Sequence, residues 1–274
     1  LSTMIAQPEQ RIVELPFLSE EECKHILEEW NATKQPYAEE VHLHQLFAEQ
    51  AALTPDAVAL TWGEIQLTYA LLNERANQLA HYLQRHAVGP EIRVGLCIQR
   101  CPELVIAVLA ILKAGGCYVP LDIELPAQRL LYQLQDAQAA LVLTQQSMQE
   151  LFAPSSASLF FVDSAWPELA LKELSTDPFN RVLSENLFCL IYTSGSTGQP
   201  KGVMLTHHGV TNHFHWHDHV FPPASDDNVL QLASISFDTS INDMFQPLLR
   251  GARLTLLKPG GQRDGTYLLR TMTE

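Results

Sequence analysis

A run of hydroxyl side chains, glycines and one lysine, YTSGSTGQPKG at residues 192–202, has the composition of a phosphate-binding loop. Glycines allow successive backbone N–H groups to converge on an anion, and Lys201 adds a point charge suited to phosphate or pyrophosphate. The loop differs from the common nucleotide-binding P-loop, because Pro200 precedes the lysine and Gly202 follows it. Four hydroxyl donors complete it: Thr193, Ser194, Ser196 and Thr197.

The segments on either side of this loop are typical of strands. NLFCLIYT (186–193) is an apolar, β-branched and aromatic run, and GVMLTH (202–207) follows. A flexible Ser/Gly linker is unexpected between two such segments. A phosphate loop at the carboxyl end of a buried strand is the better interpretation, since ligands of α/β proteins bind there.

Helix and strand patterns alternate from Val41 onward. The sequence predicts helices at 41–52, 67–86, 102–115, 126–136 and 241–251, and strands at 57–62, 92–98, 118–121, 140–144, 186–193, 202–207, 228–234 and 252–257. Residues 146–185 give no clear element. This alternation predicts an α/β fold of layered, largely parallel β-sheets covered by helices. Before it, residues 19–30 predict a short helix with a Ser cap, and WNATKQPY reads as a linker.

Composition limits the function classes. The chain has 274 residues, of which 46% are hydrophobic, and a net charge of −14. An acidic chain is a poor candidate for coating nucleic acid, and no apolar run approaches the roughly 18 residues of a membrane span. We see no targeting segment, so the sequence predicts a cytoplasmic protein. The five scattered cysteines form no zinc framework and read as free, buried thiols.

Several motifs together resemble one superfamily. LIYTSGSTGQPKGVMLTH resembles the signature loop of the adenylate-forming enzymes, which include acyl-CoA synthetases, luciferases and the adenylation domains of nonribosomal peptide synthetases. LTYALLNERANQLAHYL and LKAGGCYVPLD resemble the first two core motifs of those adenylation domains, and FDTSINDMF resembles the segment that opens their amino-acid pocket. The resemblance assigns residues 37–274 to the N-terminal part of an adenylation domain. Residues 1–36 resemble the end of a condensation domain and its linker.

This resemblance implies a reaction. An α-amino acid carboxylate attacks the α-phosphate of ATP, giving an aminoacyl adenylate and pyrophosphate. The aminoacyl group then passes to the phosphopantetheine thiol of a peptidyl carrier domain. No general base is evident or needed, because the carboxylate is already ionised at neutral pH. By resemblance the β- and γ-phosphates are bound by Thr193, Ser194, Gly195, Ser196, Thr197, Gly198 and Lys201.

The resemblance also implies a substrate pocket. Asp238 would pair with the α-ammonium group of an amino acid, and Phe237, Thr239 and Asn242 would lie beside it. Members that activate aryl or fatty acids typically lack this aspartate. Asp238 is also well placed to cap the following helix. Ser240 can serve as that cap instead, which would leave Asp238 for the substrate.

The later family motifs are not found before residue 274, so we expect the Mg²⁺ ligand, the remainder of the adenylation domain and the carrier domain to lie outside this segment. We therefore expect residues 1–274 alone to be inactive. Two alternatives stay open: an acyl- or aryl-acid ligase of the same superfamily, and a truncated, non-catalytic docking module.

Six of the eleven histidines lie in HHGVTNHFHWHDH, residues 207–219. As a strand, residues 213, 215, 217 and 219 would share one face. As a helix they form the pairs 213/217 and 215/219, and each pair could supply only two ligands to a metal ion. The sequence favours a polar helix face over a zinc site.

Overall fold

The chain divides into two units, Leu1–Ala38 and Glu39–Glu274. The computed structural model describes residues 5–6, 8–11, 13, 15–38, 40–194 and 199–273. Within these ranges no helix is both long and apolar enough to cross a membrane.

The first unit contains the short helix expected near residue 20. Helix α2 (Glu20–Lys24) continues as a π-helical turn, His25–Glu29. Ser19 begins it with a capping box: Glu22 N–H donates to Ser19 Oγ at 3.2 Å, and Ser19 N–H donates to Glu22 Oε2 at 2.7 Å. None of the residues of α2 and this turn is buried, so the local cap rather than core packing accounts for the helix.

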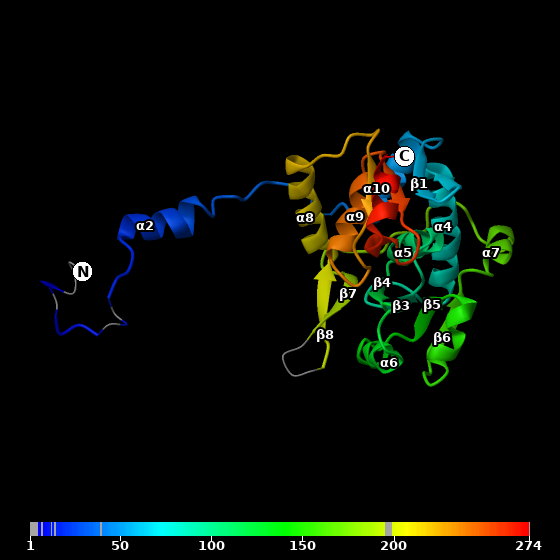
Figure 1. The fold of residues 1–274 in the computed structure, drawn as a ribbon, viewed down its shortest axis with the longest axis horizontal. Helices are drawn as coiled ribbons and strands as arrows, with labels where there is room; N and C mark the ends of the chain where they lie inside the picture. The colour runs from blue at the N-terminus through cyan, green and yellow to red at the C-terminus, as the bar shows by residue number, and fades with distance from the viewer. Residues whose placement is uncertain are drawn as a thin grey trace. The chain divides into compact units, whose positions relative to one another are not determined.

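The larger sheet of the second unit has the strand order β6-β5-β3-β4-β7-β8. All its pairs are parallel except the last, in which β8 runs antiparallel to β7. Helix α5 (Pro102–Ala114) links β3 to β4, and α6 (Ala127–Asp136) links β4 to β5 (Figure 1). The strands are β3 (Arg93–Cys97), β4 (Cys117–Pro120), β5 (Leu141–Thr144), β6 (Ser158–Phe161), β7 (Leu187–Thr193) and β8 (Lys201–Thr206).

The smaller sheet has the order β2-β1-β10-β9. It joins the hairpin β1 (Val58–Trp62) and β2 (Ile65–Thr68) to the later strands β10 (Arg253–Leu256) and β9 (Asn228–Gln231). The remaining helices are α3 (Leu43–Leu53), α4 (Tyr69–Arg85), α7 (Trp166–Lys172), α8 (His207–Val220), α9 (Thr239–Leu248) and α10 (Gly265–Thr273), with 3₁₀ turns at Gln146–Phe152 and Gly261–Arg263.

Helix α5 lies at the centre of the core. Every residue of it except Glu103 is buried. Proline stands at its start, and Gly115 ends it with φ +93°, a left-handed conformation that suits glycine. One hydrophobic cluster contains α5 together with strand residues of both sheets, such as Leu60 and Val94. The predicted α/β class, with largely parallel sheets covered by helices, is confirmed.

Some elements differ from the sequence prediction. The pattern places residues 67–68 at the start of a helix, but they end strand β2. Thr68 then caps α4 by accepting from Leu71 N–H at 3.2 Å, so the helix begins at Tyr69. Residues 146–185, which give no clear pattern, contain a 3₁₀ turn, β6 and α7. The five cysteines are free and four of them are buried, as expected.

An irregular segment, residues 173–186, leads into β7 and is held by side chains. Three side chains of α4 bond its carbonyls: Asn77 donates to Ser175 O at 2.7 Å, and His81 and Gln84 bond two further carbonyls at 2.9 and 3.0 Å. Buried Lys113 pairs with Asp177 at 2.6 Å. Polar groups from helices thus replace the hydrogen bonds that a regular element would supply.

Three histidines are buried together where α3, α8 and this irregular segment meet. His42, His44 and His207 are 1%, 3% and 1% exposed, and their ring centroids lie 4.9–5.7 Å apart. His42 Nε2 bonds Val182 O at 3.2 Å. Burial lowers the pKa of all three, and it lowers the pKa of His207 to about 3. The rings are therefore neutral in the folded protein at neutral pH.

This cluster should make the fold acid-sensitive. As pH falls below about 6.5, the unfolded chain takes up a proton on His207 while the folded chain does not until about pH 3. Stability therefore falls as pH falls through this window, by about 2 kcal/mol at pH 5 for His207 alone. Urea unfolding at pH 7 and pH 5 should show a smaller loss in His207→Gln than in the unsubstituted chain.

The control for this measurement is His219→Gln, which removes an exposed histidine from the same helix. Its pH dependence should match the unsubstituted chain. An equal loss of stability in His207→Gln and in the unsubstituted chain would show that His207 does not carry the effect.

Candidate functional site

The glycine-rich loop leaves the sheet between its last two strands. β7 ends at Thr193, and β8 begins at Lys201, which lies directly opposite Thr193 in the antiparallel register. Thr193, Ser194 and Lys201 are exposed. Gly195, Ser196, Thr197 and Gly198, which were also predicted to bind phosphate, lie outside the described residues.

Helix α6 holds both ends of the loop. Tyr192 OH donates to Asp136 Oδ2 at 2.7 Å just before it, and Tyr132 OH donates to Pro200 O at 3.5 Å just after it. Burial and the bond to Asp136 raise the pKa of Tyr192. Gly202 allows the second strand to approach, since a Cβ there would lie 3.0 Å from Leu190 Cδ1. Sequence reasoning missed Tyr132 and Asp136. Their i, i+4 spacing indicates one helix face, but nothing in it names the partner.

Two cavities adjoin the loop. The first, here called the loop cavity, is lined by Thr193, Ser194, Asp122, Arg129, Phe237 and Asp238 among others. The second, here called the helix cavity, lies between α8 and α9 and is lined by Gly209, Val210, His213, Asp238, Thr239 and Asn242 among others. Leu205 and Asp238 line both. The structure thus brings the predicted pocket residues and the start of the loop together around Asp238.

Asp238 is the N-cap of α9. Its Oδ1 accepts from Thr239 N–H at 2.8 Å, and its Oδ2 has no hydrogen-bond partner in the described part of the chain. The suggestion that Ser240 serves as the cap is wrong: Ser240 lies inside the helix, 1% exposed, and its hydroxyl donates to Phe237 O at 2.6 Å. Asp238 therefore caps with one oxygen, leaves the other without a partner in the described part of the chain, and lines both cavities.

The segment between β9 and α9, residues 232–237, is clamped on both of its edges. Arg100 donates to Leu232 O at 3.2 Å and to Ala233 O at 3.1 Å. Asp243 Oδ2 accepts from the N–H groups of the same two residues at 2.9 and 2.8 Å. Burial lowers the pKa of Arg100, while nearby carboxylates, Asp243 first, oppose that shift. These four hydrogen bonds, here called the clamp, restrain the segment that leads to Asp238 at the start of α9.

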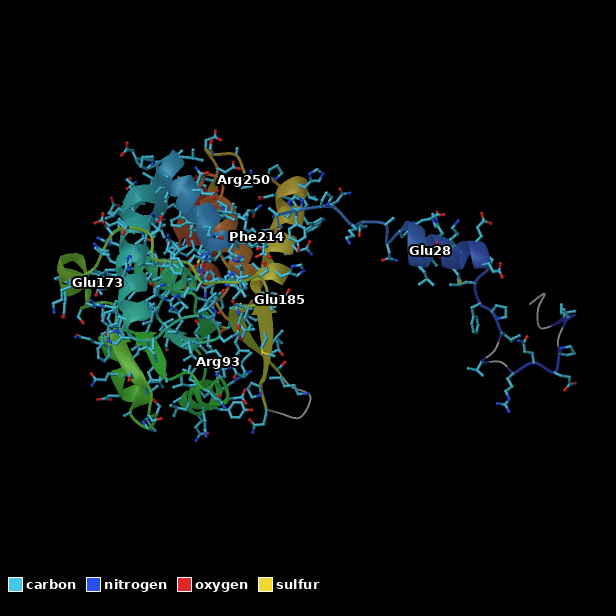
Figure 2. The ribbon with its side chains drawn as sticks, turned by 180° about the vertical axis from the view of Figure 1, so that it is seen from behind. Glu28, Arg93, Glu173, Glu185, Phe214 and Arg250 are labelled. Carbon is cyan, nitrogen blue, oxygen red and sulfur yellow. The ribbon has the colours of Figure 1, made fainter. Side chains whose placement is uncertain are left out.

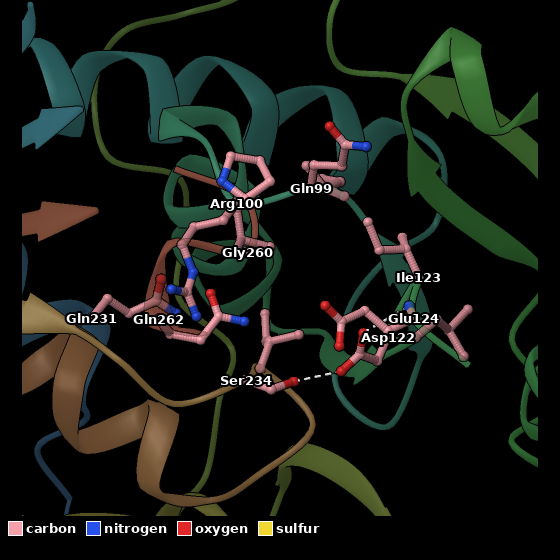
Figure 3. Close-up of a pocket in the computed structure, with 14 residues that line it drawn as sticks. Gln99, Arg100, Asp122, Ile123, Glu124, Gln231, Ser234, Gly260 and Gln262 are labelled. Atoms are coloured by element: carbon pink, nitrogen blue, oxygen red, sulfur yellow. Dashed lines mark hydrogen bonds between the residues drawn. The ribbon is translucent and has the colours of Figure 1, made fainter. Parts of the chain in front are cut away.

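A further cleft lies beside this clamp. Ser234 Oγ donates to Asp122 Oδ2 at 2.6 Å, and both residues line the cleft; Figure 3 draws this bond as a dashed line. Arg100 Nη1 and the side-chain oxygens of Gln231 and Gln262 are buried there without partners among the described residues. Asp122 also lines the loop cavity, so it joins the cleft to the site.

The histidine-rich segment forms helix α8, and its polar face packs on α9. His213 Nε2 bonds Asn242 Oδ1 at 3.0 Å, and His217 Nδ1 bonds Gln246 Nε2 at 3.1 Å. Arg250 pairs with Asp218 at 2.7 Å near the far end of α8. Figure 2 labels Arg250 and Phe214, one of the buried residues of α8. Across the described ranges, no three His, Cys, Asp or Glu side chains are arranged to hold a metal ion.

The start of a loop after a buried strand and an acidic helix cap thus line one cavity of an α/β fold. Residues 47–274 match the family of AMP-binding enzymes, and the chain belongs to that family. The resemblance to adenylation domains of nonribosomal peptide synthetases is confirmed by its relatives and structural neighbours.

Among the relatives, one component of the linear gramicidin synthase of Brevibacillus parabrevis is 42% identical over 256 residues, covering 93% of this chain and 3% of that protein. Tyrocidine synthase 3 of the same organism is 41% identical over 268 residues, covering 98% of this chain and 4% of that protein. The chain thus spans only a few per cent of these curated relatives.

Two solved structures share the fold. The nonribosomal peptide synthetase FmoA3, in its AMPPNP-bound form, gives a TM-score of 0.81 at 31% identity, over 94% of this chain and 27% of that one. The N-terminal subdomain of Klebsiella oxytoca NpsA in complex with 3-hydroxybenzoyl-AMSN gives a TM-score of 0.73 at 27% identity. The match covers 88% of this chain and 59% of that one.

The capping role of Asp238 can be measured separately from any catalytic one. Asp238→Ala should lower the free energy of unfolding by about 1 kcal/mol, because Thr239 N–H loses its acceptor. Asp238→Asn should change it little, since asparagine also caps. Urea unfolding gives both values, with Asp226→Ala, an exposed aspartate, as the matched control. Equal stability of Asp238→Ala and the unsubstituted chain would contradict the cap.

Proposed function

We propose that these residues form the phosphate-binding and amino-acid-binding part of an adenylation domain that activates an α-amino acid for nonribosomal peptide synthesis. The observation that carries this proposal is the position of Asp238, which lines both cavities and has one carboxylate oxygen without a hydrogen-bond partner in the described part of the chain. One cavity begins at the phosphate loop, and the other is a pocket between two helices. A substrate whose ammonium group meets Asp238 has its carboxylate within reach of the loop side.

The chemistry follows from these groups. An oxygen of the substrate carboxylate attacks the α-phosphorus of ATP, a new C–O–P linkage forms, and the bond from the α-phosphorus to the bridging oxygen breaks. Pyrophosphate leaves with the electron pair of that bond. Lys201, Thr193 and Ser194 supply a positive charge and hydroxyl donors to the leaving oxygens, which stabilises charge that develops in the transition state. We also assign phosphate binding to Ser196 and Thr197 through their hydroxyls, and to Gly195 and Gly198 through their backbone N–H groups.

Asp238 holds the other end of the substrate. A carboxylate facing a pocket is costly unless it meets a positive partner, and an α-ammonium group supplies one. Phe237, 64% exposed, lies in the wall of the loop cavity, while Thr239 and Asn242 line the pocket for the side chain.

The rest of the reaction is proposed for the protein that contains this chain. In it, Mg²⁺ would be bound by residues beyond Glu274, and a peptidyl carrier domain would present the phosphopantetheine thiol that receives the aminoacyl group. We assign residues 1–36 to the linker that follows a condensation domain.

Activation of an aryl acid is the second candidate. The NpsA subdomain, which shares this fold, is solved with 3-hydroxybenzoyl-AMSN. Such an acid has no ammonium group to neutralise Asp238, which favours the amino-acid assignment.

Pyrophosphate–ATP exchange in the complete adenylation domain distinguishes the two. A mixture of the twenty standard amino acids should stimulate exchange, and 3-hydroxybenzoate should not. Asp238→Asn, which keeps the helix cap, should lower amino-acid-dependent exchange by about 100-fold, because it removes the charge that pairs with the ammonium group. Residues 1–274 alone should give background exchange. Stimulation by the aryl acid only would replace the first proposal with the second.

The loop lysine has a separate test. Lys201→Ala should slow exchange by about 100-fold, since it removes a charge aimed at the leaving pyrophosphate. Lys172→Ala, which removes an exposed lysine paired with Glu168, should leave exchange unchanged. If ATP affinity and exchange rate are both unaltered in Lys201→Ala, the electrostatic role assigned to Lys201 is wrong.

A further inference from the structure

His213 reaches the proposed substrate pocket from a helix that the family resemblance did not implicate. It lies on α8, lines the helix cavity with Asp238, Thr239 and Asn242, and bonds Asn242 Oδ1 through Nε2 at 3.0 Å. His213 is therefore placed to control how Asn242 presents its amide to the cavity.

The hydrogen bond has a preferred direction. A histidine whose Nε2 carries a proton donates, and both the Nε2–H tautomer and the imidazolium ion carry one; only the remaining tautomer accepts. The side-chain oxygen of Asn242 then accepts the hydrogen bond from His213, and the NH₂ group of Asn242 has no partner in the described part of the chain. The Asp238 carboxylate in the same cavity favours this orientation, because it attracts the positive end of the amide dipole.

Further contacts restrain α8 against α9. Beyond the His213–Asn242 bond, His217 bonds Gln246 and Asp218 pairs with Arg250. Gln246 Nε2 also donates to Phe221 O at 2.8 Å, which fixes its amide. These directional contacts fix the register of α8 against α9, and with it the position of His213 opposite Asn242.

We propose that His213 is a specificity-determining residue that acts by positioning Asn242. By engaging the amide oxygen, His213 turns the NH₂ group into the cavity, and the cavity then selects amino acids whose side chain ends in an uncharged hydrogen-bond acceptor, a carboxamide above all. A side-chain carboxylate is disfavoured by the like charge of Asp238. This inference rests on the proposed function, since it assumes that the helix cavity receives the side chain of the substrate.

The test measures discrimination between substrates of similar shape. In the complete adenylation domain, kcat/KM for exchange is measured with asparagine against leucine, and with glutamine against methionine. The unsubstituted enzyme should prefer one carboxamide to its apolar counterpart by at least about 10-fold, the value of one hydrogen bond. His213→Leu should reduce that ratio about 10-fold. His213→Gln, which keeps a donor near the Nε2 position, should restore it to within about threefold.

Two further variants separate this role from a structural one. His219→Leu makes the same change at an exposed position of α8 and should leave the ratio unchanged. Asn242→Asp keeps an acceptor for His213 but replaces the inward NH₂ group with oxygen, so it should also lose the preference for the carboxamide. A ratio of two substrates on one enzyme is insensitive to the fraction of protein that folds, so reduced stability does not mimic the effect.

The outcomes are distinct. Exchange with amino acids but no preference for a carboxamide, or an unchanged ratio in His213→Leu, overturns this inference and leaves the proposed function standing. Absence of exchange with every amino acid in the unsubstituted enzyme overturns the proposed function, and the inference with it.

Discussion

The site depends on how the short segment between β9 and α9 is held. Arg100 bonds its carbonyl groups and Asp243 bonds its N–H groups, so residues 232 and 233 are restrained from both sides. Arg100 follows β3 in the larger sheet, whereas Asp243 lies on α9, beside the smaller one. One guanidinium and one carboxylate therefore couple the two sheets at the point where the chain turns toward Asp238.

The phosphate loop is also restrained by a few contacts at its ends. Two side chains of α6, one turn apart, bond residues on either side of it. The antiparallel pairing of β7 and β8 brings Lys201 opposite Thr193, so the lysine that looked displaced in sequence lies beside the first hydroxyl of the loop. The position of the Lys201 charge is therefore determined by the pairing of β7 with β8 and not by the start of a helix.

Patterns in the sequence predicted the central elements of this structure, but not β2, β6, α7 or α10. The apolar run of α5, with proline before it and glycine after it, predicts a buried helix, and the strands beside it follow from their β-branched residues. The pocket residues are a prediction that rests on the resemblance. What periodicity cannot predict are contacts between residues far apart in the chain, such as Tyr132 with Pro200 or Arg100 with Leu232. Residues 173–185 gave no pattern because helix side chains satisfy their backbone groups.

The capping position of Asp238 has a consequence for ligand binding. Asp238 lines a cavity, stands at the positive end of the α9 dipole and accepts a backbone N–H. The N–H bond and the helix dipole thus hold the carboxylate in place before any ligand arrives, while its negative charge remains for a positive partner. The site is thus preorganised: little reorganisation is needed when an ammonium group binds, so more of the interaction energy remains as affinity.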